Sequence, residues 1–183
     1  MLVWISMQKG KNRKNFKTSK NKAKKLFGII KITSKPLGFV SIPDLKDDII
    51  VFEENLNCAL NGDEVEVLII GNDRGRKKGR VIKILKRNKT NFVGTLNKNN
   101  RGFIFKPDDF KFYRDVEIFF DNQQKFSKSE NELLLKSDTK VLVKIESWTN
   151  PNLNPKGKII SIIGKKGENE TEMQSILLDK GIV

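Results

Sequence analysis

The stretch Gly38-Phe39-Val40-Ser41-Ile42-Pro43-Asp44 returns further along the chain as Gly102-Phe103-Ile104-Phe105-Lys106-Pro107-Asp108. Both copies share one frame, Gly-Phe-aliphatic-x-x-Pro-Asp. Other landmarks repeat in the same order around it: Gly28 with Gly94, Asp48-Ile49 with Asp115-Val116, Val65-Glu66-Val67 with Val141-Leu142-Val143, and Gly79-Arg80-Val81-Ile82 with Gly157-Lys158-Ile159-Ile160. This ordered series indicates that one structural unit occurs twice.

Short β-branched runs, separated by Gly, Pro and Asn, surround the first copy of the frame. Five of them are typical of strands: residues 27–32, 38–42, 49–52, 64–70 and 79–85. Turns are expected at Gly62-Asp63 and at 71–79. Because no intervening segment is long enough for a βαβ helix, we expect a small barrel that removes its exposed edges by closing. The predicted fold class is therefore all-β, with two tandem five-stranded barrels.

The expected barrels occupy residues 27–89 and 90–166. The second is longer because polar insertions, typical of loops, fall around 123–132 and 147–155. Trp148 opens the later insertion. We expect its ring to cap the barrel, and contact with a base is the alternative.

The two ends of the chain differ from the barrels. Residues 1–26 contain a lysine-rich run without acids and are predicted to form a disordered basic arm. A solubilising or targeting leader is the alternative. Residues 167–183 switch to helical spacing, with Met173, Ile176 and Leu177 on one face.

Composition limits the classes of function. Lys and Arg number 36 against 22 Asp and Glu, for a net charge of +14, so a polyanionic partner is expected. The absence of histidine removes the commonest general acid/base and zinc ligand. The single Cys58 has no second thiol to pair with and is expected to be buried and inert. The acid pairs Asp47-Asp48 and Asp108-Asp109 fall at turns, so we predict no catalytic and no metal-binding residue.

Alternation along the strands predicts which rings point away from each core. The proposed outward sets are Phe39 with Phe52 in the first barrel, and Arg101, Phe103, Phe105 and Phe119 in the second. Rings on a basic barrel suit a single strand of nucleic acid, because stacking contributes about 1–3 kcal/mol per base. The alternative is that these rings belong to the core, which is commoner for any one Phe in a strand.

A second run of cations extends from Arg74 to Lys89 and contains no acid. Together with Lys31 and Lys35, this run is predicted to form one track for an RNA backbone. Its candidate RNA-binding members are Arg74, Arg76, Lys77, Lys78 and Arg80. The alternative is a solvated face without a ligand.

These residues resemble a known family. The segment from Gly38-Phe39-Val40 through Asp48-Ile49-Ile50-Val51 and residues 54–65 is similar to the first cold-shock domain of the ribonuclease R and ribonuclease II exoribonucleases. The second copy, with Trp148 and Pro155-Lys156-Gly157, resembles the family's second cold-shock domain. Residues 172–178 resemble the helix that leads into its catalytic domain. The resemblance implies two OB-fold, cold-shock-like barrels.

The resemblance carries over four strand positions that face nucleic acid in cold-shock barrels: Phe39, Phe52, Phe103 and Phe119. Ile50 and Glu117 depart from the pattern, because such barrels often carry an aromatic residue there. Base stacking is therefore expected to be weaker in this protein than in such barrels, and nucleic-acid binding to depend more on charge.

The family consists of Mg²⁺-dependent hydrolytic enzymes that remove nucleotides from RNA 3′ ends, and its metal cluster would belong to a domain expected after Val183. The resemblance thus implies no cofactor and no catalysis in this chain. We expect a cytoplasmic monomer that binds single-stranded RNA, with the ribosome as a further partner and no membrane. A free-standing RNA chaperone and a ribosome- or protein-binding scaffold are the alternatives.

Overall fold

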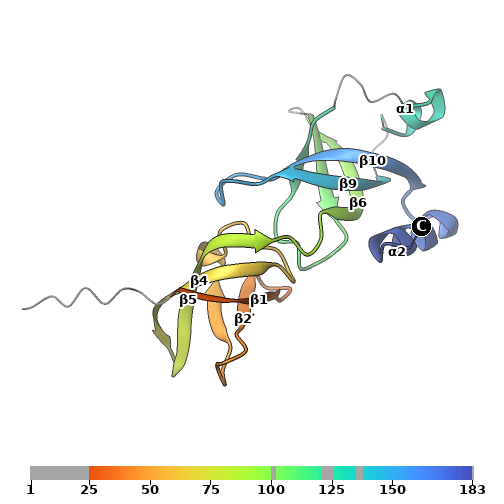
Figure 1. Ribbon diagram of the computed structural model, residues 1–183. Helices are drawn as coiled ribbons and strands as arrows, with labels where there is room; N and C mark the ends of the chain where they lie inside the picture. Colours follow the sequence, from red (N-terminus) through yellow and green to blue (C-terminus); the bar gives the residue numbers. More distant parts are fainter. Residues whose placement is uncertain (1–24, 100–101, 121–125, 135–137, 183) are drawn as a thin grey trace, which may run out of the picture.

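The computed structural model describes residues 25–99, 102–120, 126–134 and 138–182. Two β-barrels follow one another along the chain (Figure 1). The predicted all-β fold with two tandem five-stranded barrels is confirmed. The predicted arm at residues 1–26 falls almost entirely outside the described residues.

The first barrel is built from β1 (Lys25–Ile32), β2 (Leu37–Ser41), β3 (Ile49–Phe52), β4 (Glu64–Asp73) and β5 (Arg76–Lys86), with a short 3-10 helix at Glu53–Asn55. The strands close in the order β1-β2-β3-β5-β4. Neighbouring strands are antiparallel except β3 and β5, which pair in parallel through Ile50 and Lys78. This parallel pair closes the barrel.

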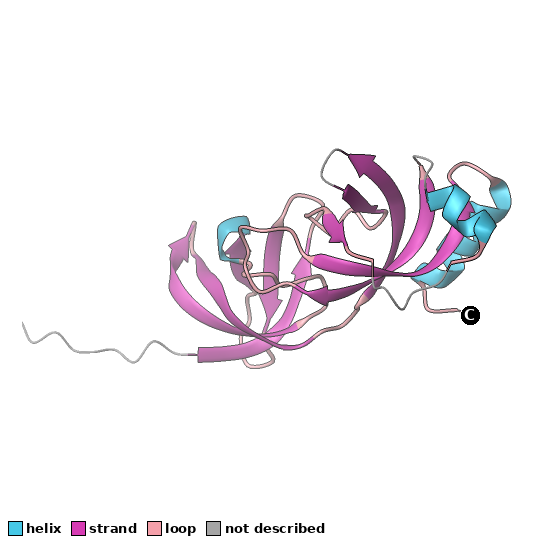
Figure 2. Cartoon of the chain, turned by 90° about the horizontal axis from the view of Figure 1, so that it is seen from above, coloured by secondary structure: helices cyan, strands magenta, loops and turns pink. Residues whose placement is uncertain are grey.

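The second barrel repeats this topology with β6 (Asn91–Asn99), β7 (Gly102–Pro107), β8 (Val116–Ile118), β9 (Thr139–Ser147) and β10 (Lys156–Lys165). Its strand order, β10-β8-β7-β6-β9, matches that of the first barrel, and β8 and β10 form the parallel pair. Helix α1 (Lys128–Leu134) lies in the insertion after β8, and helix α2 (Asn169–Asp179) follows β10. Both α-helices lie at one end of the molecule (Figure 2).

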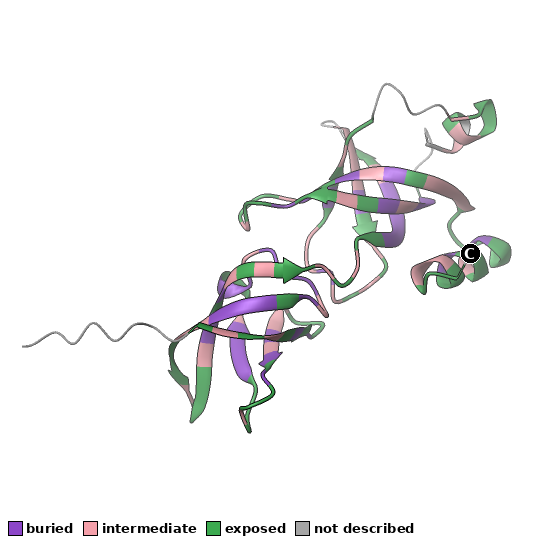
Figure 3. Ribbon diagram, viewed as in Figure 1, coloured by how far each residue is buried: buried purple, intermediate pink, exposed green. Residues whose placement is uncertain are grey.

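Alternation along the strands builds the first core. Ile30, Val40, Ile49, Val65 and Val81 come from five different strands and are almost fully buried. Figure 3 shows buried and exposed residues alternating along strands of this barrel. Since β-branched side chains pack well on a pleated surface, the same residues favour the strands and fill their interior.

The β4–β5 hairpin is longer than the sequence pattern predicts. Residues 71–79 do not form one long turn, because strand pairing continues to Asp73 and Arg76. The turn is Arg74-Gly75 alone, with φ values of 47° and 83°. Two consecutive positive φ angles are typical of the tight hairpin turn whose twist matches that of the strands.

Helix α2 contacts β6, β9 and β10. It buries the small polar residues Thr171 and Ser175, whereas Met173, Ile176 and Leu177 remain exposed. The three apolar residues therefore share a face, as their spacing predicts, but this face points to solvent. Within the described ranges no helix has both the length and the hydropathy needed to cross a bilayer.

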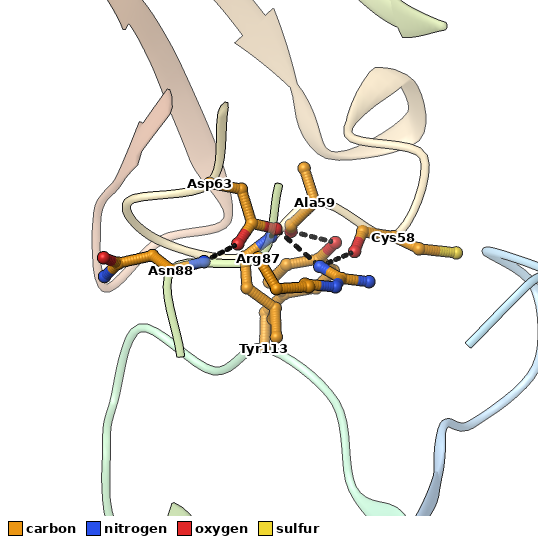
Figure 4. A network of polar contacts seen from close by, with 7 residues as sticks. Cys58, Ala59, Asp63, Arg87, Asn88 and Tyr113 are labelled. Carbon is orange, nitrogen blue, oxygen red and sulfur yellow. Dashed lines mark hydrogen bonds and ion pairs between the residues drawn. The ribbon is translucent and has the colours of Figure 1, made fainter. Parts of the chain in front are cut away.

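A buried carboxylate organises the junction between the barrels (Figure 4). Asp63 is 0 % exposed and accepts hydrogen bonds from the main-chain N–H groups of Leu60 (2.8 Å) and Asn88 (3.0 Å). Arg87 Nη1 lies 2.5 Å from Asp63 Oδ2 and also donates to the Cys58 carbonyl at 2.8 Å. The linker that follows β5 is thus held against the first barrel.

This junction corrects one prediction about the cation run. Arg87 is ion-paired with Asp63, and Lys89 Nζ lies 2.6 Å from Asp179 Oδ1 in α2. These two cations serve the fold, so the predicted continuous track does not extend through the linker.

Candidate nucleic-acid interface

One row of side chains crosses the outer face of the first barrel. Strand pairing sets Lys31 of β1 opposite Phe39 of β2, Phe39 opposite Ile50 of β3, and Ile50 opposite Lys78 of β5. Their neighbours Gly38 and Val40 face the core, so alternation turns Phe39 outward. The outer row, defined as Lys31, Phe39, Ile50 and Lys78, presents a ring and an aliphatic side chain between two cations.

Phe52 extends the outer row on β3. Lys78 Nζ lies 4.5 Å from the centroid of the Phe52 ring and 3.6 Å from Glu54 Oε1. Ile50 is only 8 % exposed, although it points away from the core cluster. The row therefore has a closely packed apolar centre with charges at its edges.

The other predicted cations of this barrel occupy two places. Arg80 lies next to the outer row and donates through Nε to Asn55 Oδ1 at 2.9 Å. Arg74, Arg76 and Lys77 are exposed at the tip of the β4–β5 hairpin, and Lys35 is exposed in the loop between β1 and β2. The structure thus gathers Lys31, Phe39, Phe52, Lys78 and Arg80 on one face, whereas Lys35 and the hairpin cations stand at its margins.

Phe105 is not an outward residue, and this prediction is wrong. It is 0 % exposed and belongs to the second core. Phe105 pairs with Leu96 and Val116, as Val40 pairs with Ile30 and Ile49.

Phe105 therefore occupies the structural position of Val40, one residue away from the match that the Gly-Phe frame suggests. A slip of one residue moves every side chain of a strand to the opposite face.

The same slip relocates Phe103. It takes the inward position of Gly38, is partly buried against the second core, and packs edge-to-face on Phe120 with ring centroids 5.1 Å apart. The prediction that Phe103 belongs to the outer face is therefore also corrected. Phe119 does point outward and is 42 % exposed, at the position matching Phe52. Arg101 falls outside the described residues.

The second barrel has its own row at the equivalent place. Asn97 pairs with Ile104, Ile104 with Glu117, and Glu117 with Lys156. Compared with the outer row, an amide replaces Lys31 and a carboxylate replaces Ile50. The two barrels therefore share a topology but differ in the charge of this face.

Sequence reasoning missed Asn97, Ile104 and Lys156 as members of this row. A signal was present, because the spacing from Gly28 to Gly94 differs from that between the two Gly-Phe frames. The mismatch indicates that the number of residues between equivalent positions of the two copies differs between the first strand and the second strand.

Two other predictions concern side chains with competing interpretations. Trp148 is buried in the second core, and its Nε1 donates to the carbonyls of Asn150 (3.1 Å) and Leu153 (3.0 Å), so the capping interpretation is confirmed. Cys58 is buried, as expected, and burial raises the pKa of its thiol. A buried neutral thiol is a poor nucleophile.

Both members of the second acid pair, Asp108 and Asp109, have partners within the second barrel. Asp109 Oδ1 accepts a hydrogen bond from the Lys111 N–H at 2.9 Å, which is a turn interaction, and Asp108 pairs with the buried Lys140. Among the residues that the structure describes, no group of three or more acids or cysteines is placed to hold a metal ion.

Comparisons with known proteins agree with this architecture. A family model described as the ribonuclease B OB domain matches residues 28–84, and one described as a cold shock domain matches residues 104–183. Ribonuclease R of Thermotoga maritima is 28% identical over 169 residues, which cover 89% of this chain and 22% of that protein. Ribonuclease R of Mycoplasma pneumoniae is 29% identical over 167 residues, with coverages of 87% and 22%.

Solved structures give the same result. RNase R of Mycoplasma genitalium, in complex with ribose-methylated single-stranded RNA, superposes with a TM-score of 0.70 at 26% identity, covering 86% of this chain and 24% of that one. Yeast Ssd1, a pseudonuclease, shares the fold with a TM-score of 0.70 at 22% identity, over 87% of this chain and 25% of its own. The chain thus spans about a quarter or less of the relatives it matches. In sequence and in fold, the chain therefore resembles the N-terminal OB-fold and cold-shock region of the ribonuclease R family.

Proposed function

We propose that this chain binds single-stranded RNA on the outer face of its first barrel and supplies RNA binding to a ribonuclease R-type exonuclease. The observation that carries the proposal is the outer row. Its four residues lie on four neighbouring strands in direct register, with Lys31 and Lys78 on either side of Phe39 and Ile50.

The row matches the two parts of a single strand. Bases present flat π-faces that stack on rings whatever the sequence, and phosphates follow each base at short intervals. Phe39 and Phe52 offer rings, while Lys31, Lys78 and Arg80 offer cations within the same face. Since a flexible strand can splay its bases toward the sheet and its phosphates toward the rim, both contacts can form together.

The relatives support this assignment without placing the ligand. The Mycoplasma genitalium RNase R structure contains single-stranded RNA, and it matches 86% of this chain. We extend RNA as a partner from that protein to this chain because the barrels are shared and the net charge is +14.

The chain matches 22–24% of the ribonuclease R relatives, and the resemblance implies that their hydrolytic activity belongs to the remainder. We therefore propose that the chain binds RNA and leaves it intact. Incubation of the purified chain with a 3′-labelled oligoribonucleotide and Mg²⁺ is expected to leave the label attached, and stepwise 3′ trimming would contradict the proposal.

Binding can be tested with a fluorescein-labelled oligouridylate and fluorescence anisotropy. Phe39→Ala is expected to weaken binding by about fivefold or more, the effect of losing one stacked base. Phe110→Ala is the matched control, because Phe110 is an exposed ring on the second barrel. If Phe39→Ala and Phe110→Ala leave the affinity equally unchanged, the outer row is not the binding face.

A further inference from the structure

We propose that the bound strand leaves the outer row along β1, where Phe27 and Ile29 form a second stacking subsite for a longer single-stranded RNA. This inference rests on the proposed function and adds the path of the strand. The β1 strip is defined as Lys25, Phe27, Ile29 and Lys31, the residues of β1 that point away from the core.

Exposure is the first observation. The burial of β1 alternates, and all four members of the β1 strip are exposed, while Ile30 and Ile32 are buried in the core. Phe27 is 57 % and Ile29 is 49 % exposed. Two large apolar side chains that share one face of a strand form a patch, which marks a contact surface more often than a single exposed residue does.

Continuity with the outer row is the second observation. Lys31 belongs to both surfaces, because it is the β1 member of the outer row and the last residue of the β1 strip. Phe27 stands four residues from Lys31 on the same face. At about 3.4 Å per residue this is about 14 Å, a distance that two nucleotides of an extended strand span.

Charge is the third observation. The acids opposite the β1 strip, Glu64 and Glu66, are both paired: Glu66 Oε1 lies 3.0 Å from Lys25 Nζ, and Glu64 Oε1 lies 3.8 Å from Lys86 Nζ. Because both carboxylates are ion-paired with lysines, they repel the phosphates of a bound strand less strongly. In the sequence, the residues that precede Lys25 include lysines and no acid back to residue 8.

The equivalent face of the second barrel is a less favourable exit. There Glu117 occupies the place of Ile50 and Asn97 the place of Lys31. Within the described part of the chain, no ion pair engages the exposed Glu117 carboxylate. A strand that crosses this row brings phosphates toward the Glu117 carboxylate as well as toward Lys156, whereas a strand that follows β1 meets lysines and no acid on the strip itself.

The length of the oligonucleotide separates the two subsites experimentally. The outer row crosses three strand spacings, about 14 Å in all, which a diuridylate covers by itself, whereas a dodecauridylate also reaches the β1 strip. Affinities of both oligonucleotides for the full chain are measured by NMR titration and anisotropy. Phe27→Ala is expected to weaken binding of the dodecamer by about fivefold or more and to leave binding of the dimer unchanged, while Phe39→Ala weakens both.

Two further variants keep the test decisive. Phe27→Leu retains apolar area without a ring and is expected to behave as Phe27→Ala, whereas Phe27→Trp is expected to restore dodecamer binding. Equal effects of Phe27→Ala on both lengths, or no effect on the dodecamer, would overturn the β1 path. If the proposed function itself is wrong, the result differs: Phe39→Ala then leaves binding of the diuridylate intact.

Discussion

The hydroxyl of Tyr113, in the second barrel, donates a hydrogen bond of 3.0 Å to the main-chain carbonyl of Ala59, in the first. The Tyr113 ring packs against both hydrophobic cores and lies 5.5 Å from the Trp148 ring. This hydrogen bond joins the two barrels directly, next to the Asp63–Arg87 pair that holds the linker against the first barrel.

Tyr113→Phe removes the hydroxyl and keeps the ring. We expect the free energy of unfolding to fall by about 1 kcal/mol, since one partly buried hydrogen bond disappears and the Ala59 carbonyl is left without its donor. Urea denaturation of the two proteins measures the difference. Equal midpoints and slopes would show that the junction does not depend on this hydrogen bond.

Tyr113 is also the only tyrosine, so phenolate absorbance reports on it alone. Burial raises its pKa above the usual 10.0, with the Cys58 thiol adding to the effect. A folded-state pKa above the unfolded one contributes stability that is present below the unfolded pKa and is lost as pH rises beyond it. We expect tyrosine ionisation to coincide with alkaline unfolding, and a normal titration in the folded protein would contradict the buried position.

Asp63→Asn tests the junction from the first barrel. The amide nitrogen of Asn cannot accept from Leu60 N–H or Arg87, so Arg87 loses its buried counter-ion. We expect a loss of about 3 kcal/mol in the free energy of unfolding. The control is Glu64→Gln, because the exposed Glu64–Lys86 pair at 3.8 Å should contribute less than about 0.5 kcal/mol. Comparable effects for the two variants would contradict the role of Asp63.

Acid should weaken the attachment of α2. The Gly167 N–H donates to Glu172 at 2.8 Å and lowers the pKa of this carboxyl, and the buried Lys140 lowers it further. A carboxyl with a depressed folded-state pKa contributes stability above its unfolded value of 4.5, and this contribution is lost as pH falls.

The stability difference between the parent protein and Glu172→Gln is therefore expected to be present near neutral pH and to shrink below pH 4.5. Thermal unfolding over a pH series measures it. Glu170→Gln, on the same turn, is the charge-matched control. A difference that stays constant in acid would show that the carboxylate is not the group that titrates.

The repeat and the strand pattern made the fold predictable. Five short β-branched runs around the Gly-Phe frame have one stable solution, a closed barrel, and the structure has that solution twice. The β4–β5 turn was predicted too long because Arg74 adopts a positive φ angle, a conformation that residue identity does not favour.

The candidate site was predictable only in part. Phe39 and Phe105 both follow a hydrophobic alternation. The Gly28-to-Gly94 spacing signals a changed offset, and the pairing of β6 with β7 shows that the slip is one residue. Likewise, Arg87 and Arg76 lie in the same basic run, so the local sequence does not show which of them is ion-paired. Only the fold brings Asp63 next to Arg87. Long-range register and buried charge are tertiary properties that a local pattern does not contain.

The salt dependence of oligouridylate binding tests the role of the outer row most directly. Replacing Lys31 and Lys78 together by alanine is expected to lower the log–log slope of affinity against salt by about 1.4, about 0.7 for each phosphate that a lysine no longer neutralises. The matched control replaces Lys46 and Lys165, two exposed lysines away from the outer row. A slope that changes equally in both double variants, or in neither, would contradict RNA binding by the outer row.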